Sequence, residues 1–318
     1  MDKETRSASI VKLIIWTLVA VILIGVLAVW SISALNGGAP YGTFSLFGGY
    51  VYDDADAYSV GNAEYAVDEV DCIDLSWAAG TVDVVIYGGD TFKVEENGSF
   101  DENDRMRSRV LDGTLTVKFA SSGIRLFGYS IEKELILYIP ASACERIKMI
   151  NIDSLSANVN IGKGSNEHLI ALSLERLNIA SASGSVTASL GKAKDLSIET
   201  LSGDIDLKVG SVENAEISTV SGRIQLDGET KRGAIEAVSG AILIETYNSI
   251  PSSLNVETVS GNVELKVPDL SDGFDADLDT VSGKMTCNGK RSSNYQHGNG
   301  KSSFNFETVS GNVTVTVK

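Results

Sequence analysis

The chain has 318 residues, of which 43% are hydrophobic, enough for a substantial core and too many for a disordered protein. Its formal net charge of −16 excludes nucleic acid as a partner, because phosphates repel an acidic surface. The 31 glycines and only 4 prolines, with frequent Val, Ile, Ser and Thr, favour many short strands joined by glycine turns. This composition excludes a helical bundle.

An uncharged run from Leu13 to Ile32 is the first element of the chain. In a helix, at about 1.5 Å per residue, it would be roughly 30 Å long, which matches the hydrocarbon core of a bilayer. The run therefore predicts a transmembrane helix. The alternatives are a buried core helix and a signal peptide that is cleaved near Ser33. A core helix would show a polar face, and a signal peptide has a shorter apolar region of about 7–15 residues.

Basic residues set the orientation of this helix. Lys3, Arg6 and Lys12 precede it, and no Lys or Arg follows until Lys93. Because positively charged flanks stay in the cytoplasm, residues 1–12 are predicted to be a cytoplasmic tail. The protein is then a single-pass protein of the plasma membrane with its bulk outside the cytoplasm.

The next segment, residues 33–70, is rich in Gly, Tyr, Ala and Asp and shows no sustained periodicity, which predicts a juxtamembrane spacer. Beyond it, residues 71–318 are predicted to form one extracytoplasmic all-β domain. Alternating apolar and polar residues predict its first strands. These strands are expected at residues 72–77, 81–86, 114–119 and 134–140.

From Ala141 onward a motif typified by IETLSGDIDL and VETVSGNVEL recurs. A further copy replaces the motif's glycine with Ala157. The spacings between the glycines are 19, 19, 18, 21, 22 and 28 residues, so the period is near 20 with insertions. The motif glycines are Gly184, Gly203, Gly222, Gly240, Gly261, Gly283 and Gly311.

The phase of the alternation shifts at each Ser-Gly, which predicts a corner where glycine takes positive φ and serine binds the freed backbone groups. Stacked units of this size bury a continuous apolar stripe, so the motif predicts a β-solenoid. A β-sandwich is the alternative, but it does not require one motif in every second strand. One interior column is predicted from Val220, Val238, Val259, Val281 and Val309. A second is predicted from Ile224, Ile242, Val263, Met285 and Val313.

The TVSGNV and TLSGDI motifs, together with YIPAS at residues 138–142, resemble the bacterial "putative adhesin" β-strand-repeat family, a domain of unknown function. The resemblance covers about residues 71–318. It implies a bacterial envelope protein behind one transmembrane helix, in some cases encoded beside envelope-stress regulators. It implies no catalytic residues and no cofactor.

Carboxylates recur four residues before the motif glycines, and stacking would bring them into one outward column. One hypothesis is a weakly calcium-binding stripe that relieves their repulsion. The alternative is a solvated polar face without a metal, because calcium needs oxygens that converge from loops and the nonapeptide calcium repeat is absent. The column consists of Glu199, Glu236, Glu257, Asp279 and Glu307.

Enzyme signatures are sparse. Acid pairs such as Asp204 and Asp206 fall at ordinary outward positions of a repeat, although solenoids do include polysaccharide-active enzymes with paired carboxylates. His168 and His297 are the only histidines, which is too few for a triad or a metal cluster. The cysteines, Cys72, Cys144 and Cys287, are predicted to be buried small hydrophobes, and a Cys72–Cys144 bridge is the open alternative.

The sequence stops within the alternating segment 313–318. A solenoid normally protects its last strand, because an open edge pairs with other chains. We therefore expect a contact at this end, either in a homo-oligomer or by strand addition to a partner. The alternative is that Lys318 and twist protect the edge.

These patterns predict a non-enzymatic, membrane-anchored surface protein with an adhesion or scaffold role. Its ligand, whether glycan, wall polymer or protein, is not encoded in any motif. An accessory role in envelope-stress sensing through the ectodomain is the alternative. A polysaccharide-active solenoid enzyme is a minor alternative.

Overall fold

The computed structural model describes residues 43–44, 49–124, 131–162 and 172–318. They divide into two compact units. The N-terminal unit comprises the described residues up to Ala193, and the C-terminal unit is Lys194–Lys318. In both units the regular structure is strand, interrupted in the N-terminal unit by short 3-10 helices.

The predicted transmembrane helix, Leu13–Ile32, lies outside the described residues. Within the described part of the chain, no helix is long and apolar enough to cross a membrane.

The N-terminal unit contains three short 3-10 helices among its described residues: η1 (Ala55–Ala57), η2 (Val67–Glu69) and η3 (Ala141–Ala143). Its shorter strands are β1 (Thr43–Phe44), β2 (Gly49–Val51), β3 (Ser59–Val60), β4 (Ala63–Ala66), β6 (Thr91–Asn97), β7 (Arg107–Leu111), β8 (Thr114–Lys118) and β9 (Gly123–Ile124). Its longer strands are β5 (Cys72–Tyr87), β10 (Lys133–Pro140), β11 (Met149–Ile161) and β12 (Ser173–Ser183). Strand β13 (Val186–Ser202) begins in this unit and ends in the next.

Strand β5 is the centre of the N-terminal unit. Its first half pairs in parallel with β8 and β11, and its second half pairs in parallel with β10 and β11. Strand β11 in turn pairs in parallel with β12 and with the start of β13. The strands predicted at residues 72–77, 81–86, 114–119 and 134–140 are confirmed as β5, β8 and β10.

Antiparallel strands extend this unit beyond its parallel pairs. Strand β7 pairs with β3 and β8, and β6 pairs with β4 and β10. The described residues 49–70 therefore belong to the folded unit, whereas the sequence predicted a spacer. Aromatic and apolar burial explains the difference, because Tyr52 and Tyr58 are each 7% exposed and Val70 is fully buried.

The C-terminal unit consists of two parallel sheets whose strands alternate along the chain. The first contains the end of β13, the second part of β14 (Ile205–Ser221), the second part of β15 (Ile224–Ser239), β17 (Ser253–Ser260), β23 (Ser302–Ser310) and β19 (Phe274–Thr280). The other contains the first parts of β14 and β15, then β16 (Ile242–Glu245), β18 (Val263–Val267), β24 (Asn312–Val317) and β20 (Lys284–Cys287). This parallel register confirms the solenoid over the sandwich.

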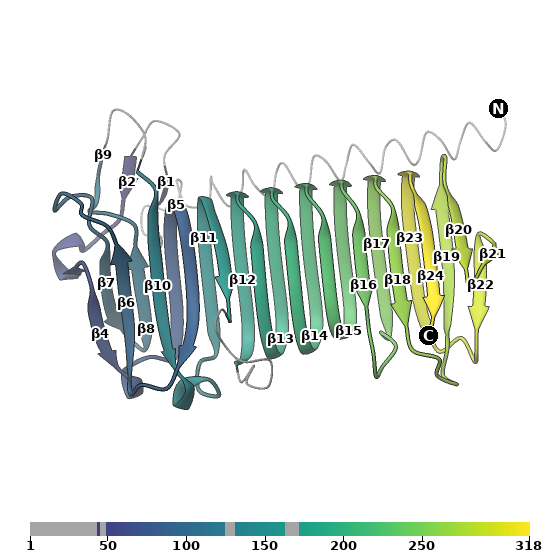
Figure 1. Ribbon diagram of the computed structural model, residues 1–318, viewed down its shortest axis with the longest axis horizontal. Helices are drawn as coiled ribbons and strands as arrows, with labels where there is room; N and C mark the ends of the chain where they lie inside the picture. The colour runs from purple at the N-terminus through teal and green to yellow at the C-terminus, as the bar shows by residue number, and fades with distance from the viewer. Residues whose placement is uncertain (1–42, 45–48, 125–130, 163–171) are drawn as a thin grey trace. The chain divides into compact units, whose positions relative to one another are not determined.

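The last coils of the solenoid do not stack in chain order. Strand β23 pairs with β17 on one side and β19 on the other, and β24 pairs with β18 and β20. Figure 1 shows β23 and β24 between the coil of β17 and β18 and the coil of β19 and β20, both of which come earlier in the chain. The prediction of an open edge at residues 313–318 is therefore wrong, because this strand has a partner on each side.

The strands at the end of the C-terminal stack are β19 and β20, and short antiparallel strands cover them. Strand β22 (Asn294–His297) pairs with β19, and β21 (Lys290–Arg291) pairs with β20. Short, charged edge strands are a common protection against pairing with other chains. Homo-oligomerisation through the C-terminal strand remains a prediction without the open edge that motivated it.

The interior of the C-terminal unit confirms one predicted column and corrects the other. Ile224, Ile242, Val263, Met285 and Val313 are each at most 2% exposed. The column from Val220 to Val309 is instead half-buried on the outer face, and Val281 is 50% exposed. The neighbouring threonines point inward, as Thr219 and Thr308 do at 0% and 3% exposure. The corner shifts the alternation by one residue from the predicted phase, which exchanges the two faces.

The motif glycines are required mainly because backbones approach closely. A Cβ on Gly240 would lie 1.9 Å from the Gly222 carbonyl oxygen, and one on Gly261 would lie 1.9 Å from that of Gly240. Positive φ occurs at Gly184, Gly203, Gly222 and Gly240, with values from 121° to 155°, but not at Gly261, Gly283 or Gly311. The predicted corner is confirmed, and its first cause is stacking distance rather than φ.

Candidate functional site

The predicted carboxylate column exists on the outer face of the C-terminal unit. Glu236 is in register with Ser218 and Glu257, and Glu307 is in register with Glu257 and Asp279. The column therefore follows the spatial order of the strands, with Glu307 before Asp279. Residue Glu199 precedes Ser218 in this face, since the next residue, Thr200, donates to Thr219 at 2.9 Å between the two Oγ1 atoms.

Burial raises the pKa of three of these carboxyl groups, and neighbouring carboxylates raise it further. Burial is the largest cause at Glu199, Glu236 and Glu307. Glu236 is affected by Glu257, and Glu307 by Glu257 and Asp279. Glu199, Glu236 and Glu307 thus lie partly withdrawn from water and beside like charges, which disfavours their ionised forms.

A column of half-exposed apolar side chains runs beside the carboxylates, because residues two apart on a strand share a face. This column is the one that the sequence placed in the interior. We call the two columns together the acid–valine face. Its carboxylates are Glu199, Glu236, Glu257, Glu307 and Asp279, and its apolar residues are Leu201, Val220, Val238, Val259, Val309 and Val281.

The geometry of the acid–valine face does not converge on a metal. Its carboxylates project in the same direction from adjacent strands, which are separated by about 4.8 Å. In the part of the chain that the structure describes, no group of three or more His, Cys, Asp or Glu side chains could hold a metal ion. The face therefore offers a line of charge rather than a coordination shell.

The corners contain a polar ladder that sequence reasoning missed. Where Asp204 or Asn262 follows the glycine, its side chain accepts a backbone hydrogen bond from the equivalent residue of the neighbouring coil, as Asp204 Oδ1 does from the Arg223 amide at 2.8 Å. Asn262 Oδ1 accepts from the Asn312 amide at 3.0 Å in the same way. The recurrence of Asn or Asp after Ser-Gly was the available signal. These side chains stabilise stacking and leave Asp204 unsuited to pair with Asp206 in acid–base chemistry.

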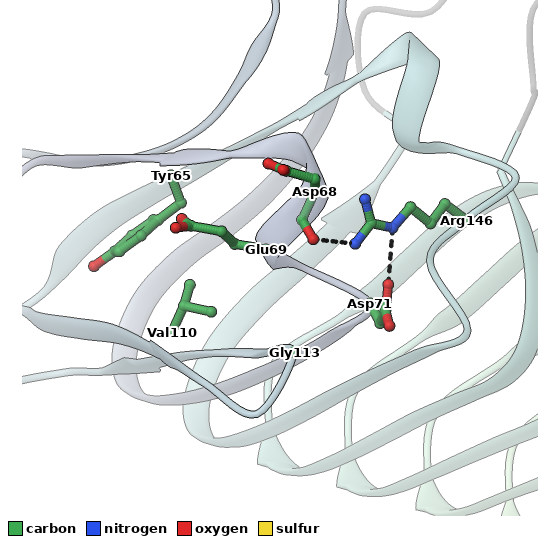
Figure 2. Close-up of a pocket in the computed structure, with 7 residues that line it drawn as sticks. All are labelled: Tyr65, Asp68, Glu69, Asp71, Val110, Gly113 and Arg146. Carbon is green, nitrogen blue, oxygen red and sulfur yellow. Dashed lines mark hydrogen bonds and ion pairs between the residues drawn. The ribbon is translucent and has the colours of Figure 1, made fainter.

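A pocket of about 500 Å³ opens in the N-terminal unit (Figure 2). Its walls come from the end of β4, η2, the residue before β5, the β7–β8 hairpin and the segment after η3. Its lining residues are Tyr65, Asp68, Glu69, Asp71, Val110, Gly113 and Arg146.

Hydrogen bonds fix one wall of this pocket. Arg146 Nε donates to Asp71 Oδ1 at 2.8 Å, and the Arg146 Nη2 group donates to the Asp68 carbonyl. The Asp71 amide donates to the Gly113 carbonyl at 2.7 Å, which holds the hairpin turn in place. The bond from Arg146 keeps the pKa of Asp71 below its usual value, so Asp71 is ionised at neutral pH.

The N-terminal unit also buries a pair of opposite charges. Lys133 Nζ lies 2.9 Å from Glu96 Oε2, and their side chains are 0% and 2% exposed. Lys133 also donates to the Asp104 carbonyl at 2.7 Å and lies 4.2 Å from the centre of the Phe119 ring. Glu96 accepts two bonds from the Met106 amide. Every bond in this cluster fixes the folded unit, so its role is structural.

A second group of buried charges lies on β5 and β8. Burial raises the pKa of Asp74 to about 7, against the opposing effect of Lys118 and with a smaller contribution from Asp153. Asp74 Oδ1 is buried without a hydrogen-bond partner among the described residues. Lys118 is fully buried and donates to Ser76 Oγ at 3.1 Å. Both residues alternate with apolar residues in their strands, a pattern that predicts an outward side chain, so the sequence gives no signal of their burial.

The remaining predicted residues do not assemble a reactive centre. His297 Nε2 lies 2.9 Å from Asp269 Oδ1, and His168 lies outside the described residues. Cys72, Cys144 and Cys287 are free, so the alternative of a Cys72–Cys144 bridge is not realised. Burial raises the pKa of all three thiols, that of Cys287 to about 11.

Comparison with known proteins gives one family match. The family model described as Toastrack DUF4097 matches residues 72–316. No curated protein matches the chain.

Several solved structures are similar to this chain at low identity. A putative adhesin from Bacteroides fragilis is 13% identical, with 82% of this chain and 97% of that chain covered and a TM-score of 0.46. A putative adhesin from Parabacteroides distasonis is 16% identical over the same shares, with a TM-score of 0.44. A putative lipid binding protein from Parabacteroides distasonis is 15% identical, again over 82% and 97%, with a TM-score of 0.44.

Proposed function

Because the chain belongs to the Toastrack DUF4097 family, and because its repeated coils present one chemistry along a whole face, we propose that it is a non-enzymatic surface protein that binds an extended partner. The binding surface in this proposal is the acid–valine face. The partner is an extended peptide segment that carries both cationic and apolar side chains.

The observation that carries this proposal is the parallel course of the two outer columns. Carboxylates in register on adjacent strands repel one another, and burial and neighbouring charge already raise the pKa of Glu199, Glu236 and Glu307. A cationic partner would relieve this repulsion. The half-exposed valines beside the carboxylates would gain free energy when a partner removes them from water.

An extended segment fits this surface better than a compact one. Apart from Ser218 on β14, the columns continue from strand to strand with the same residue types, so a partner can make the same contact several times. Repeated contacts within one chain raise the overall affinity without requiring any single strong contact. A scaffold or adhesion role follows from a surface of this kind.

The anchor belongs to the same proposal. The uncharged run Leu13–Ile32, preceded by Lys3, Arg6 and Lys12, would place both units outside the cytoplasm of a single-pass protein. The N-terminal part of the ectodomain is acidic, because residues 53–104 contain fifteen Asp or Glu residues and one Lys. This segment would repel anionic lipid, which would keep the binding face accessible.

The proposal is tested by the binding of a peptide in which Lys and Val alternate to the full chain in lipid nanodiscs. The expected result is saturable binding that weakens at least about tenfold in the Glu236→Gln, Glu257→Gln, Glu307→Gln variant, because three charge contacts are lost. A peptide in which Lys and Ser alternate should bind more weakly than the Val peptide, and one in which Glu and Val alternate should not bind.

The matched control changes the same number of charges elsewhere. In the N-terminal unit, Asp90, Asp101 and Glu102 are exposed acids, so the Asp90→Asn, Asp101→Asn, Glu102→Gln variant tests net charge alone. Equal loss of binding in both variants would refute the proposed surface. An unchanged affinity in the first variant would refute it as well.

A further inference from the structure

We propose that the pocket in the N-terminal unit is a second binding site, which receives the ammonium or guanidinium group of a lysine or arginine side chain on a peptide. The site is separate in residues from the acid–valine face. It goes beyond the proposed function, because it assigns a ligand to a single concave pocket rather than to a repeated surface.

The lining residues of the pocket carry a net negative charge, which favours a cationic ligand. The pocket is lined by three carboxylates, Asp68, Glu69 and Asp71, and by one cation, Arg146. In the described structure Asp71 is paired with Arg146 at 2.8 Å and with Lys148 at 3.7 Å. The carboxylates of Asp68 and Glu69 are exposed and form no ion pair with a described residue. Three carboxylates against Arg146 and Lys148 therefore leave one excess negative charge at the pocket.

Arg146 is a poor anion site. Two of its five N–H groups already donate within the protein, from Nε to Asp71 and from Nη2 to the Asp68 carbonyl. An anionic ligand at the remaining N–H groups would face the Asp68 and Glu69 carboxylates. The same bonds hold the wall of the pocket rigid, which lowers the entropic cost of binding a cation there.

The rest of the lining suits an aliphatic stem. The Tyr65 hydroxyl donates to Ser108 Oγ at 2.8 Å, which fixes the ring, and an aromatic face attracts a cation within about 6 Å of its centre. Figure 2 shows the Glu69 side chain directed toward Tyr65, with Val110 facing the same space. A lysine side chain can therefore place its methylenes against Val110 and Tyr65 and its ammonium group at Glu69.

The size of the pocket agrees with a side chain and its flanking backbone. Ligand pockets commonly measure about 300–1,000 Å³, and this one measures about 500 Å³. Among the described residues, the Ala66 amide alone donates to the Glu69 carboxylate, at 3.3 Å. Its other lone pairs are free to accept charge-assisted hydrogen bonds from a ligand.

The test uses the full chain in nanodiscs with methyl-labelled valine, so that the Val110 resonance reports on the pocket itself. Nα-acetyl-lysine amide is the probe, and Nα-acetyl-norleucine amide, which lacks the amine, is its neutral control. We expect the lysine probe to shift the Val110 resonance with a saturable curve and the norleucine probe to leave it unchanged. Glu69→Gln should weaken binding about tenfold, because a hydrogen bond to a charged group is lost.

Matched variants separate this site from general attraction to an acidic protein. Glu102→Gln removes an exposed acid outside the pocket lining and should leave the lysine titration unchanged. The Glu236→Gln, Glu257→Gln, Glu307→Gln variant should also leave it unchanged, so failure of the acid–valine face does not imply failure here. An unmoved Val110 resonance, or equal weakening by Glu69→Gln and Glu102→Gln, would overturn the proposal.

Discussion

The two units of this protein are stabilised in different ways. The C-terminal unit repeats one corner, in which glycines such as Gly240 lie against the carbonyl of the preceding coil. The N-terminal unit depends on contacts that occur once, above all the buried Lys133–Glu96 pair. Repetition spreads stability over many small equivalent terms, whereas a buried charge pair concentrates it in a few atoms. A single substitution at the buried pair should therefore lower the free energy of unfolding more than a single substitution at one of the repeated corners.

The largest effect is expected at Lys133. Substitution Lys133→Met leaves Glu96 charged and buried. Its remaining side-chain bonds to described residues come from the Met106 amide and from Arg105 Nε, which lies 3.4 Å away. Loss of one partner of a buried pair costs about 3–5 kcal/mol. We expect the free energy of unfolding of the N-terminal unit to fall by this amount, as measured by urea titration of Trp77 fluorescence with Trp16 and Trp30 replaced by Phe.

An exposed ion pair provides the control. Lys93 lies 2.9 Å from Glu64, and their side chains are 33% and 57% exposed. Exposed pairs contribute about 0–1 kcal/mol, so Lys93→Met should change the unfolding free energy far less. Similar losses in the two variants would contradict the structural role of the buried pair.

The next effect is expected at a corner of the C-terminal unit. Gly240→Ala places a Cβ 1.9 Å from the Gly222 carbonyl oxygen at a φ of 144°. Backbone must move, and we expect a loss of at least about 2 kcal/mol. Amide hydrogen exchange should accelerate in β15 and β17. Gly88→Ala, where nothing lies within 4 Å of the added Cβ, should have little effect, and equal exchange in both variants would argue against close stacking.

The third effect depends on pH and arises at Asp74. Its pKa is raised from 3.8 to about 7 in the folded state by burial, with Lys118, Asp153, Arg109 and Tyr58 around it. A raised acid pKa means that the folded state binds the proton on Asp74 more tightly than the unfolded state does. The stabilisation of the folded state by this proton is therefore complete below about pH 4 and is lost as the pH rises through about 7. The unfolding free energy should fall by about 1.4 kcal/mol per pH unit across that window.

Asp74→Asn removes the titrating group and should flatten this pH dependence. The measurement is urea unfolding of the N-terminal unit at pH 5, 6, 7 and 8 for both proteins. A wild-type slope that persists in the variant would assign the pH dependence to another group.

The smallest effect is expected on the acid–valine face. The pKa of Glu236 is raised by burial first and by Glu257 next, so Glu236→Gln should stabilise the C-terminal unit by a few tenths of a kcal/mol at neutral pH. The gain should vanish below the unfolded pKa of glutamate, where the wild-type carboxyl is protonated in both states. Thermal unfolding of the wild type and the variant at pH 7.5 and pH 4 measures the gain and its loss. A variant less stable than the wild type at pH 7.5 would contradict the repulsion between the carboxylates.

Repetition also decides how much of the fold could be predicted. The Ser-Gly motif, the corner at each glycine and the buried column at Ile224 were predictable because they recur at a fixed period. The order of the last coils was not, because β23 carries the same motif as β17 and β19 and fits beside either one. The only signal was the 28-residue step before Gly311, which contains the covering strands β21 and β22.

Single contacts left no comparable signal in the sequence. Threonine and valine are both β-branched, so the motif alone could not decide whether Thr219 or Val220 faces inward. Lys118 stands at an outward position of β8, and only tertiary contacts bury it. Lys133 and Glu96 are in phase with the buried apolar residues of β10 and β6, but their charge argued against burial. The carboxylate column was predicted with its members, whereas the pocket was not, because Tyr65, Val110 and Arg146 come from separated segments.

The central claim is that the repeated face of the C-terminal unit, rather than the net acidity of the protein, binds the partner. Photo-crosslinking of the peptide in which Lys and Val alternate to the full chain, followed by mass spectrometry, tests it most directly. Crosslinks are expected to concentrate on β14, β15, β17 and β23 at the acid–valine face, and Lys-Ser peptides are expected to give few. Crosslinks that concentrate on the acidic residues 53–104, or that spread evenly over both units, would contradict it.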